Sequence, residues 1–370
     1  MPAVLKHDSI MEKGEAETVP KEELRPRPAV ERMAPYSPPT GGRADKLRLD
    51  FNENTIGCSP RVTQFIAENL VENDLAVYPE YSDARKELAQ FFQVADEEML
   101  FTNGTDEAIQ VLVNTYVDDD DEVLILRPTY AMYKFYSEVA GAVVREIDYR
   151  VAKLEFPLQE LLGAITPSTR AILIANPNNP TGTGTNLDGI ERILNKAPNA
   201  AVLIDEAYYE FCGVTALPMM ADYPNLFVSR TFSKVYGMAG MRFGCLFSSA
   251  LNIKWLHKAQ SPYSVNSLAA LAARAAVRDQ GYIRRYVTEV LAARELLYVG
   301  LEKLKIPYFQ SQANFVLLHA GDRAIPIRDA LRSRGILVRD RSYELPGCVR
   351  VTVGTRDQIR RFLEELSAIW

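Results

Sequence analysis

AILIANPNNPTG (residues 171–182) and AVLIDEAYYEF (residues 201–211) each join a short apolar run to a polar turn. Both runs are rich in Val, Ile and Leu on both faces, which is typical of a parallel strand covered by helices on both sides. Similar runs, several of them separated by helical stretches, stand at residues 122–126, 142–147, 226–230 and 243–247. The alternation predicts an α/β fold with a large domain, in which helices flank a mostly parallel sheet.

The pattern changes twice along the chain and predicts three regions. Residues 1–44 hold seven of the 21 prolines and many charges, so we expect a partly disordered tail, or an arm that lies on a partner. Residues 76–261 carry the strand and helix alternation of the large domain. Residues 45–75 and 262–370 form a smaller α+β domain, where a long helical stretch precedes short strands.

Composition argues against several classes of protein. With 42 Lys and Arg against 48 Asp and Glu, the net charge is −6, and no basic face for nucleic acid is expected. No apolar run reaches the roughly 18 to 20 residues that span a bilayer, and the charged first residues do not resemble a secretory signal. Three scattered histidines and four cysteines without C-x-x-C spacing predict no metal site and a reducing, cytoplasmic location.

Ligands of open α/β sheets bind outside the carboxyl ends of the strands, so the turn after each run is a candidate site. Gly104, Thr105 and Asp106 open a helix after residues 99–102, which suits either a bound phosphate or an ordinary capped helix. Tyr130 follows residues 122–126, where it could stack on a planar ligand or belong to the core.

Two further strand ends carry polar side chains. Asn179 could present its amide to a ligand oxygen or serve the turn alone. Asp205 ends a strand, and a buried carboxylate there needs a cation, which could be a protonated ring nitrogen or a basic side chain. Tyr208, three residues later, could reach a phenolic oxygen of the same ligand.

SRTFSKVYGMAGMRFG (residues 229–244) is a cationic loop rich in donors, with Thr231, Ser233, Lys234 and Arg242 among glycines. A lysine near positive groups has a lowered pKa and becomes a nucleophile, although a lysine taken alone is more often a surface residue. A phosphate cradle, a stacking aromatic ring, an acid and a lysine together suit pyridoxal phosphate.

NPNNPTG, DEAYYEF and SRTFSKVYGMAGMRFG resemble the signatures of the fold-type I pyridoxal-phosphate aminotransferases of class I and II, from about residue 35 to the C-terminus. The resemblance is closest to the histidinol-phosphate aminotransferases, through LDFNENTIGCSP, FTNGTDEAIQ, RPTYAMY, SPYSVN and CVRVTVGT. The chain departs from that pattern at Thr55, where the family often has Pro, and in its longer N-terminal tail.

The resemblance implies a role for each cofactor-binding residue. Lys234 would hold the cofactor as a Schiff base and carry the substrate proton, and Asp205 would pair with the ring nitrogen. Tyr208 and Asn179 would bind the ring's 3-oxygen, and Tyr130 would stack on the ring. The cofactor phosphate would be held by Gly104, Thr105, Asp106, Thr231, Ser233 and Arg242, and by Tyr78 of a neighbouring subunit.

The resemblance also implies a substrate pocket in a homodimer with shared active sites. The substrate-binding residues would be Tyr36, Asn54, Tyr263, Asn314, Arg339 and Arg350. Arg350 would grip the substrate's acidic group, and Arg339 offers a second cation for a phosphate unless it pairs with Asp340 or Glu344.

The implied reaction is a ping-pong transfer from the amino donor histidinol phosphate to 2-oxoglutarate, in histidine biosynthesis. An aromatic amino-acid aminotransferase or a phosphoamino-acid decarboxylase of the same family is the alternative. A non-catalytic cofactor-binding regulator is less favoured, because residues 1–44 are too short and too rich in proline for a DNA-binding domain.

Overall fold

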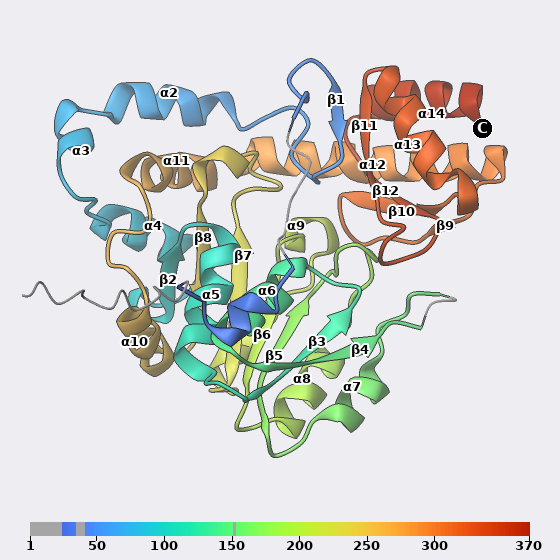
Figure 1. Cartoon of the computed structure of the whole chain (residues 1–370). Coiled ribbons are helices and arrows are strands. Elements are labelled where there is room, and N and C mark those ends of the chain that lie inside the picture. The colour runs from blue at the N-terminus through green and yellow to red at the C-terminus, as the bar shows by residue number, and fades with distance from the viewer. Residues whose placement is uncertain (1–23, 35–40, 151–152) are drawn as a thin grey trace, which may run out of the picture.

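The computed structural model describes residues 24–34, 41–150 and 153–370 (Figure 1). Within them, a seven-stranded sheet has the order β2-β8-β7-β6-β5-β3-β4. Its strands are β2 (Met99–Thr102), β3 (Glu122–Arg127), β4 (Val143–Asp148), β5 (Thr169–Ala175), β6 (Ala201–Asp205), β7 (Leu226–Thr231) and β8 (Gly244–Phe247). The pairs from β4 to β7 are parallel, and β8 is antiparallel to both of its neighbours. The prediction of a mostly parallel α/β sheet is confirmed.

Alternate residues of the central strands pack on opposite sides of this sheet. Leu203 of β6 belongs to one buried cluster, whereas Val202 and Ile204 belong to the other. Both faces are therefore apolar, as expected for a sheet covered by helices on both sides. The helices between residues 82 and 259 are α4 (Ser82–Phe92), α5 (Gly104–Tyr116), α6 (Ala131–Ala140), α7 (Leu158–Ala164), α8 (Leu187–Lys196), α9 (Tyr209–Cys212) and α10 (Ala250–Ala259).

A second, five-stranded sheet is found in the described part of the chain, with the order β1-β11-β12-β10-β9. Its strands are β1 (Leu47–Leu49), β9 (Tyr308–Phe309), β10 (Phe315–His319), β11 (Ile336–Asp340) and β12 (Cys348–Thr352). The remaining helices are α1 (Pro28–Glu31), α2 (Pro60–Asn69), α3 (Glu72–Ala76), α11 (Ser267–Arg278), α12 (Gln280–Leu304), α13 (Ala324–Ser333) and α14 (Arg356–Ile369). Short 3-10 turns are η1 (Asp96–Glu98), η2 (Leu217–Ala221), η3 (Ala239–Met241) and η4 (Gly321–Arg323).

The long helical stretch expected near residues 266–304 is divided into α11 and α12. Asp279 separates them, and its carboxylate accepts a hydrogen bond from the backbone N–H of Tyr282 at 3.3 Å, which caps α12. Of the predicted tail, residues 1–23 and 35–40 lie outside the described residues, whereas α1 packs against α6. The three-region division stays a prediction.

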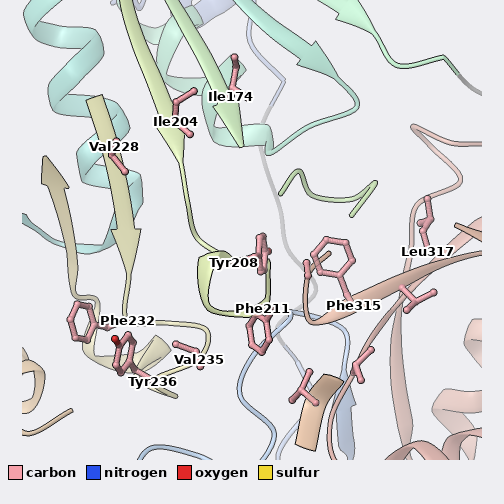
Figure 2. Close-up of a cluster of buried hydrophobic side chains, with 14 of the residues drawn as sticks. Ile174, Ile204, Tyr208, Phe211, Val228, Phe232, Val235, Tyr236, Phe315 and Leu317 are labelled. Atoms are coloured by element: carbon pink, nitrogen blue, oxygen red, sulfur yellow. The ribbon is translucent and has the colours of Figure 1, made fainter. Parts of the chain in front are cut away.

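The two sheets meet through side chains that follow β6 and side chains of β10 (Figure 2). Tyr208 contacts Phe315 edge-on, with ring centroids 5.2 Å apart. This contact brings the turns after β5, β6 and β7 against the smaller sheet. Among the described helices, none is long and apolar enough to cross a membrane.

Candidate active site

A cavity of about 580 Å³ opens where the turns of the large sheet face the small sheet. Most of the residues predicted for the site line it, although they come from strand ends spread over more than 200 positions of the sequence. These lining residues are Thr105, Asp106, Tyr130, Asn179, Asp205, Tyr208, Thr231, Ser233, Lys234, Arg242, Arg339 and Arg350.

Asp205 is buried at the end of β6 and is held by two neutral donors. The Tyr133 hydroxyl donates to its Oδ2 at 2.8 Å, and the Ser229 hydroxyl donates to its Oδ1 at 2.8 Å. Burial raises the pKa of Asp205, and these two hydrogen bonds oppose that rise. No cationic side chain bonds to Asp205 in the described part of the chain, so the geometry suits a cationic ligand atom better than a structural salt bridge.

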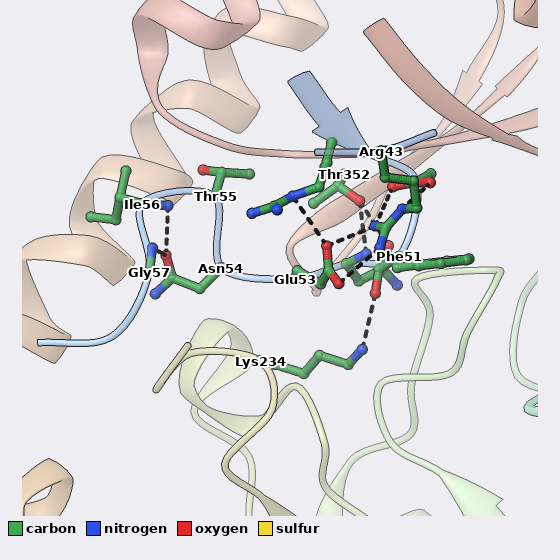
Figure 3. A network of polar contacts seen from close by, with 12 residues as sticks. Arg43, Phe51, Glu53, Asn54, Thr55, Ile56, Gly57, Lys234 and Thr352 are labelled. Atoms are coloured by element: carbon green, nitrogen blue, oxygen red, sulfur yellow. Dashed lines mark hydrogen bonds and ion pairs between the residues drawn. The ribbon is translucent and has the colours of Figure 1, made fainter. Parts of the chain in front are cut away.

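Lys234 follows β7 and points across the cavity toward residues 50–54, which we call the crossing segment (Figure 3). Its Nζ donates to the carbonyl oxygen of Phe51 at 3.0 Å. Burial lowers the pKa of Lys234 to about 8, and the positive charge of Arg350 contributes. A lysine in this environment supplies a neutral, nucleophilic amine far more readily than an exposed lysine does.

The turn after β2 brings a ring hydroxyl, a carboxylate and a guanidinium together. Asp106 accepts from the Tyr130 hydroxyl at 2.6 Å and from Arg242 at 3.1 Å. Gly104 has φ +75°, a left-handed conformation that favours glycine, and a Cβ there would lie 2.5 Å from the Arg242 guanidinium and displace it. The free backbone N–H groups of α5 begin at this point, which makes the turn suitable for an anion.

Arg350 and Arg339 lie opposite each other on β12 and β11. Arg350 is buried, which lowers its pKa to about 10, and it donates to Asn179 Oδ1 and to the carbonyl oxygen of Asp50. Its Nε has no hydrogen-bond partner among the described residues, and the same is true of Nε of buried Arg341, which also lines the cavity. These uncompensated donors suit an acidic ligand.

Arg339 also lines the cavity, with its guanidinium 5.5 Å from the centre of the Phe51 ring. Within the described residues, Asp340 forms its ion pair with Arg328 and Glu344 forms its ion pair with Arg341. The alternative of an Arg339 salt bridge to either acid is therefore wrong: the Arg339 guanidinium lines the cavity, and Glu344 is a more distant opposite charge.

Two predicted pocket residues are committed to the backbone instead of the cavity. Asn54 is buried, and its Nδ2 donates to the Val235 carbonyl at 2.9 Å. Asn314 is buried as well, and its Nδ2 donates to the Asn52 carbonyl at 3.2 Å. Both side chains hold the crossing segment in place and do not line the cavity of this chain.

Tyr78 and Tyr263 lie outside the cavity on the surface. They stack on each other with ring centroids 4.3 Å apart and are 75% and 51% exposed. Gly104 does not line the cavity either, but lies directly behind Arg242. Tyr36 lies outside the described residues.

Several residues at the site were missed by sequence reasoning. Tyr133 and Ser229 hold Asp205, and both could have been found: Tyr133 is one helical turn from Tyr130, and Ser229 is two residues from Thr231 on the same face of β7. Phe51 and Asn52 lie in the quoted segment LDFNENTIGCSP, but no local signal gave their contacts, because their partners are 156 to 300 residues away. No group of His, Cys, Asp or Glu able to hold a metal ion is found among the described residues.

The model of the family "Aminotransferase class I and II" matches residues 44–366. A histidinol-phosphate aminotransferase of Symbiobacterium thermophilum is 36% identical over 356 residues, covering 92% of this chain and 98% of its own. One from Dehalococcoides mccartyi is 36% identical and covers 86% and 89% of the two chains. The crystal structure of histidinol-phosphate aminotransferase from Sinorhizobium meliloti, in complex with pyridoxal-5'-phosphate, superposes with a TM-score of 0.83 at 23% identity, covering 94% and 99%.

The last of these likenesses shows the fold alone, whereas the family match and the 36% identity extend over nearly the whole chain. With most of the predicted residues lining one cavity, the assignment follows: this chain belongs to the aminotransferases of class I and II.

Proposed function

We propose that the chain is a pyridoxal-phosphate-dependent aminotransferase that moves an amino group from histidinol phosphate to 2-oxoglutarate. The observation that carries the proposal is one cavity lined by Lys234, Asp205 and a group of arginines. The relatives that match most of the chain bear the name of this activity, which supports the choice of substrate.

The residues of the cavity fit the cofactor. Lys234 would bind its aldehyde carbon, buried Asp205 would face the ring nitrogen, and Tyr130 would lie against the ring. Its phosphate would meet Thr231, Ser233, Arg242 and the N–H groups that open α5. Because the Asp106 carboxylate already binds Arg242 and Tyr130, we expect Asp106 to contact the phosphate through its backbone. When bound, the cofactor supplies an electron sink for the bond being broken at the substrate Cα.

The chain's own part in the reaction is proton transfer and charge placement. Lys234, with its lowered pKa, is suited to take the proton from the substrate Cα and to return it to the former aldehyde carbon of the cofactor. The Tyr133 and Ser229 hydroxyl groups hold the Asp205 carboxylate in one orientation, in which it would keep the ring nitrogen of a bound cofactor protonated.

The arginines of the cavity support two acidic substrates, one with a carboxylate and one with a phosphate. Arg350 is suited to the carboxylate of 2-oxoglutarate and glutamate, and Arg339 is suited to the phosphate of histidinol phosphate. An aromatic amino acid without a phosphate would leave the charge of Arg339 unused.

We further propose a homodimer in the cytoplasm with shared active sites. Tyr78 and Tyr263 are exposed on one chain, and this would be explained if a second copy covers them and uses them at its own cavity. Cys58, Cys212, Cys245 and Cys348 are all free thiols, as suits a reducing compartment.

A half-reaction screen tests the function. The purified protein with pyridoxal phosphate should show a visible absorption band that borohydride fixes at Lys234, and Lys234→Ala should lose this band. Histidinol phosphate should bleach the band at far lower concentration than phenylalanine, tyrosine or phosphothreonine. Preferential bleaching by an unphosphorylated aromatic amino acid would replace the proposal with an aromatic aminotransferase. Carbon dioxide release from phosphothreonine would indicate a decarboxylase.

A further inference from the structure

The amide of Asn52 connects the crossing segment to the Tyr208 phenol. Asn52 is buried, and its Nδ2 donates to the Tyr208 hydroxyl oxygen at 3.0 Å. Its φ of +56° lies in the left-handed region, which asparagine and aspartate tolerate better than most residues do. This contact joins a residue that follows β1 of the small sheet to one that follows β6 of the large sheet.

Thr352 fixes which end of the amide faces the phenol. The backbone N–H of Asn52 donates to Thr352 Oγ1 at 2.9 Å, and that hydroxyl in turn donates to Asn52 Oδ1 at 3.1 Å. With Oδ1 committed as an acceptor, the amino end of the amide must face Tyr208. The hydroxyl of a β12 residue thereby sets the direction of the hydrogen bond between Asn52 and Tyr208.

The direction of that bond decides where the Tyr208 proton goes. The phenol has one proton, and its oxygen already accepts from Asn52. Within the described part of the chain the Tyr208 proton has no acceptor, although Tyr208 lines the cavity. We propose that Asn52 is a positioning residue that holds the Tyr208 hydroxyl as a donor into the cavity, toward the cofactor's ring oxygen. This inference rests on the proposed function.

Asn52→Asp reverses the hydrogen bond with little change of shape. A carboxylate only accepts, so the Tyr208 proton would turn toward residue 52 and the cofactor's ring oxygen would lose a donor. An oxygen without its donor is more basic, and it holds the proton of the neighbouring Lys234–cofactor linkage more strongly. The pKa of that linkage should therefore rise by about one unit or more. The measurement is a pH titration of the visible absorption band.

Two other variants keep the test valid if Asn52→Asp folds poorly. Thr352→Val leaves Asn52 and Tyr208 intact but frees the amide to turn over, and should raise the same pKa by a smaller amount. Asn176→Asp is the matched control, because Asn176 is also buried and its side chain bonds only to the backbone of Thr185. The control should leave the pKa of the band within a few tenths of a unit, since a shift near one unit corresponds to a lost hydrogen bond.

A double-mutant cycle separates the hydrogen bond from the added charge. In a Tyr208→Phe background, Asn52→Asp should shift the band's pKa much less than in the wild type. An equal shift in both backgrounds, or no shift in either Asn52→Asp or Thr352→Val, would overturn the inference while leaving the proposed function intact. A wild-type protein without a borohydride-fixable band at Lys234 would instead refute the proposed function, and the inference with it.

Discussion

Lys234 is the residue whose chemistry depends most on its surroundings. Because burial and Arg350 lower its pKa to about 8, its amine should be half deprotonated near pH 8, well below the ordinary lysine value of 10.5. In cofactor-free protein, labelling of Lys234 by an amine-reactive anhydride should therefore rise with pH to a plateau with a midpoint near 8. Mass spectrometry of the peptide that contains residue 234 gives the midpoint.

The variant Arg350→Met tests whether Arg350 contributes to the lowered pKa of Lys234. Loss of a neighbouring positive charge favours the protonated amine, so the Lys234 midpoint should move to higher pH. A wild-type midpoint close to 10.5 would show that the amine is solvated as on a surface. A downward move in the variant would show that Arg350 does not lower the pKa of Lys234.

Arg339 should discriminate between the two substrates of the proposed reaction. Arg339→Ala removes one charge-assisted contact, worth about 1.5–3 kcal/mol, so KM for histidinol phosphate should rise about ten- to hundredfold. KM for glutamate in the reverse direction should change much less, because Arg350 is retained. Steady-state kinetics with both donors measure this difference.

Arg334→Ala is the matched control for that variant, since Arg334 lies at the end of neighbouring α13, pairs with Glu365 and does not line the cavity. It should leave both KM values near those of the wild type. An equal rise of KM for histidinol phosphate and for glutamate in Arg339→Ala would show that Arg339 does not recognise the phosphate.

At the scale of elements, strands β6 and β7 are joined on the side of the sheet away from the site. Asp205 and Ser229 are register partners, and the next residues, Glu206 and Arg230, form a buried ion pair at 2.7 Å. Arg230 also stacks 3.5 Å from the centre of the Tyr209 ring. The pair therefore holds the two strand ends from which Asp205, Thr231 and Lys234 reach the cavity.

Removal of one residue of the Glu206–Arg230 ion pair should destabilise the fold. Arg230→Met leaves the Glu206 carboxylate buried without its cation, which should lower the free energy of unfolding by about 3–5 kcal/mol. Arg127→Ala, at the exposed ion pair with Asp148, should cost less than about 1 kcal/mol. Urea denaturation of both variants gives the comparison, and similar midpoints for the two would mean that the Glu206–Arg230 pair does not hold the strands.

The elements themselves could largely be predicted from local sequence, for a physical reason. The segment SDARKELAQFF has a helical period and coincides with α4, and the apolar run AVLID coincides with β6. Burial of one side of a helix, or of both faces of a strand, leaves such a local pattern of apolar residues. Two-residue β9 and three-residue β1 are too short to leave a period. The break between α11 and α12 depends on a single cap at Asp279, inside a pattern that otherwise favours one continuous helix.

At the scale of the whole molecule, some contacts of the site could be predicted from local sequence and others could not. Lys234, Asp205 and Asn179 follow strands of one parallel sheet, so their convergence could be expected from the sequence. The contact of Asn52 with Tyr208 joins the two sheets across 156 positions, and its contact with Thr352 lies within the small-sheet side across 300 positions. No local pattern encodes such pairings. The same distance effect explains why Asn54 and Asn314 were expected in the pocket but instead hold the crossing segment.

The exposed apolar surface near Tyr78 predicts that two copies of the chain associate. Leu75 and Val77 are 68% and 57% exposed beside the stacked pair of Tyr78 and Tyr263, which leaves apolar side chains clustered in water. Burial of such a cluster against a second copy is favourable at roughly 25 cal/mol per Å² of apolar surface. We therefore expect the wild type to sediment at twice the 41.5 kDa of one chain.

A double variant, Leu75→Asp with Val77→Asp, should dissociate the dimer, because charges would have to be buried at the interface. If Tyr78 reaches the neighbouring cavity, the monomer should also bind pyridoxal phosphate at least about tenfold more weakly, the equivalent of one lost hydrogen bond to a phosphate. Ile325→Asp on α13, at the opposite end of the molecule from α3 (Figure 1), is the matched control for an added surface charge. Sedimentation equilibrium and cofactor titration measure the two effects, and a fully active species of one-chain mass would show that each chain completes its own site.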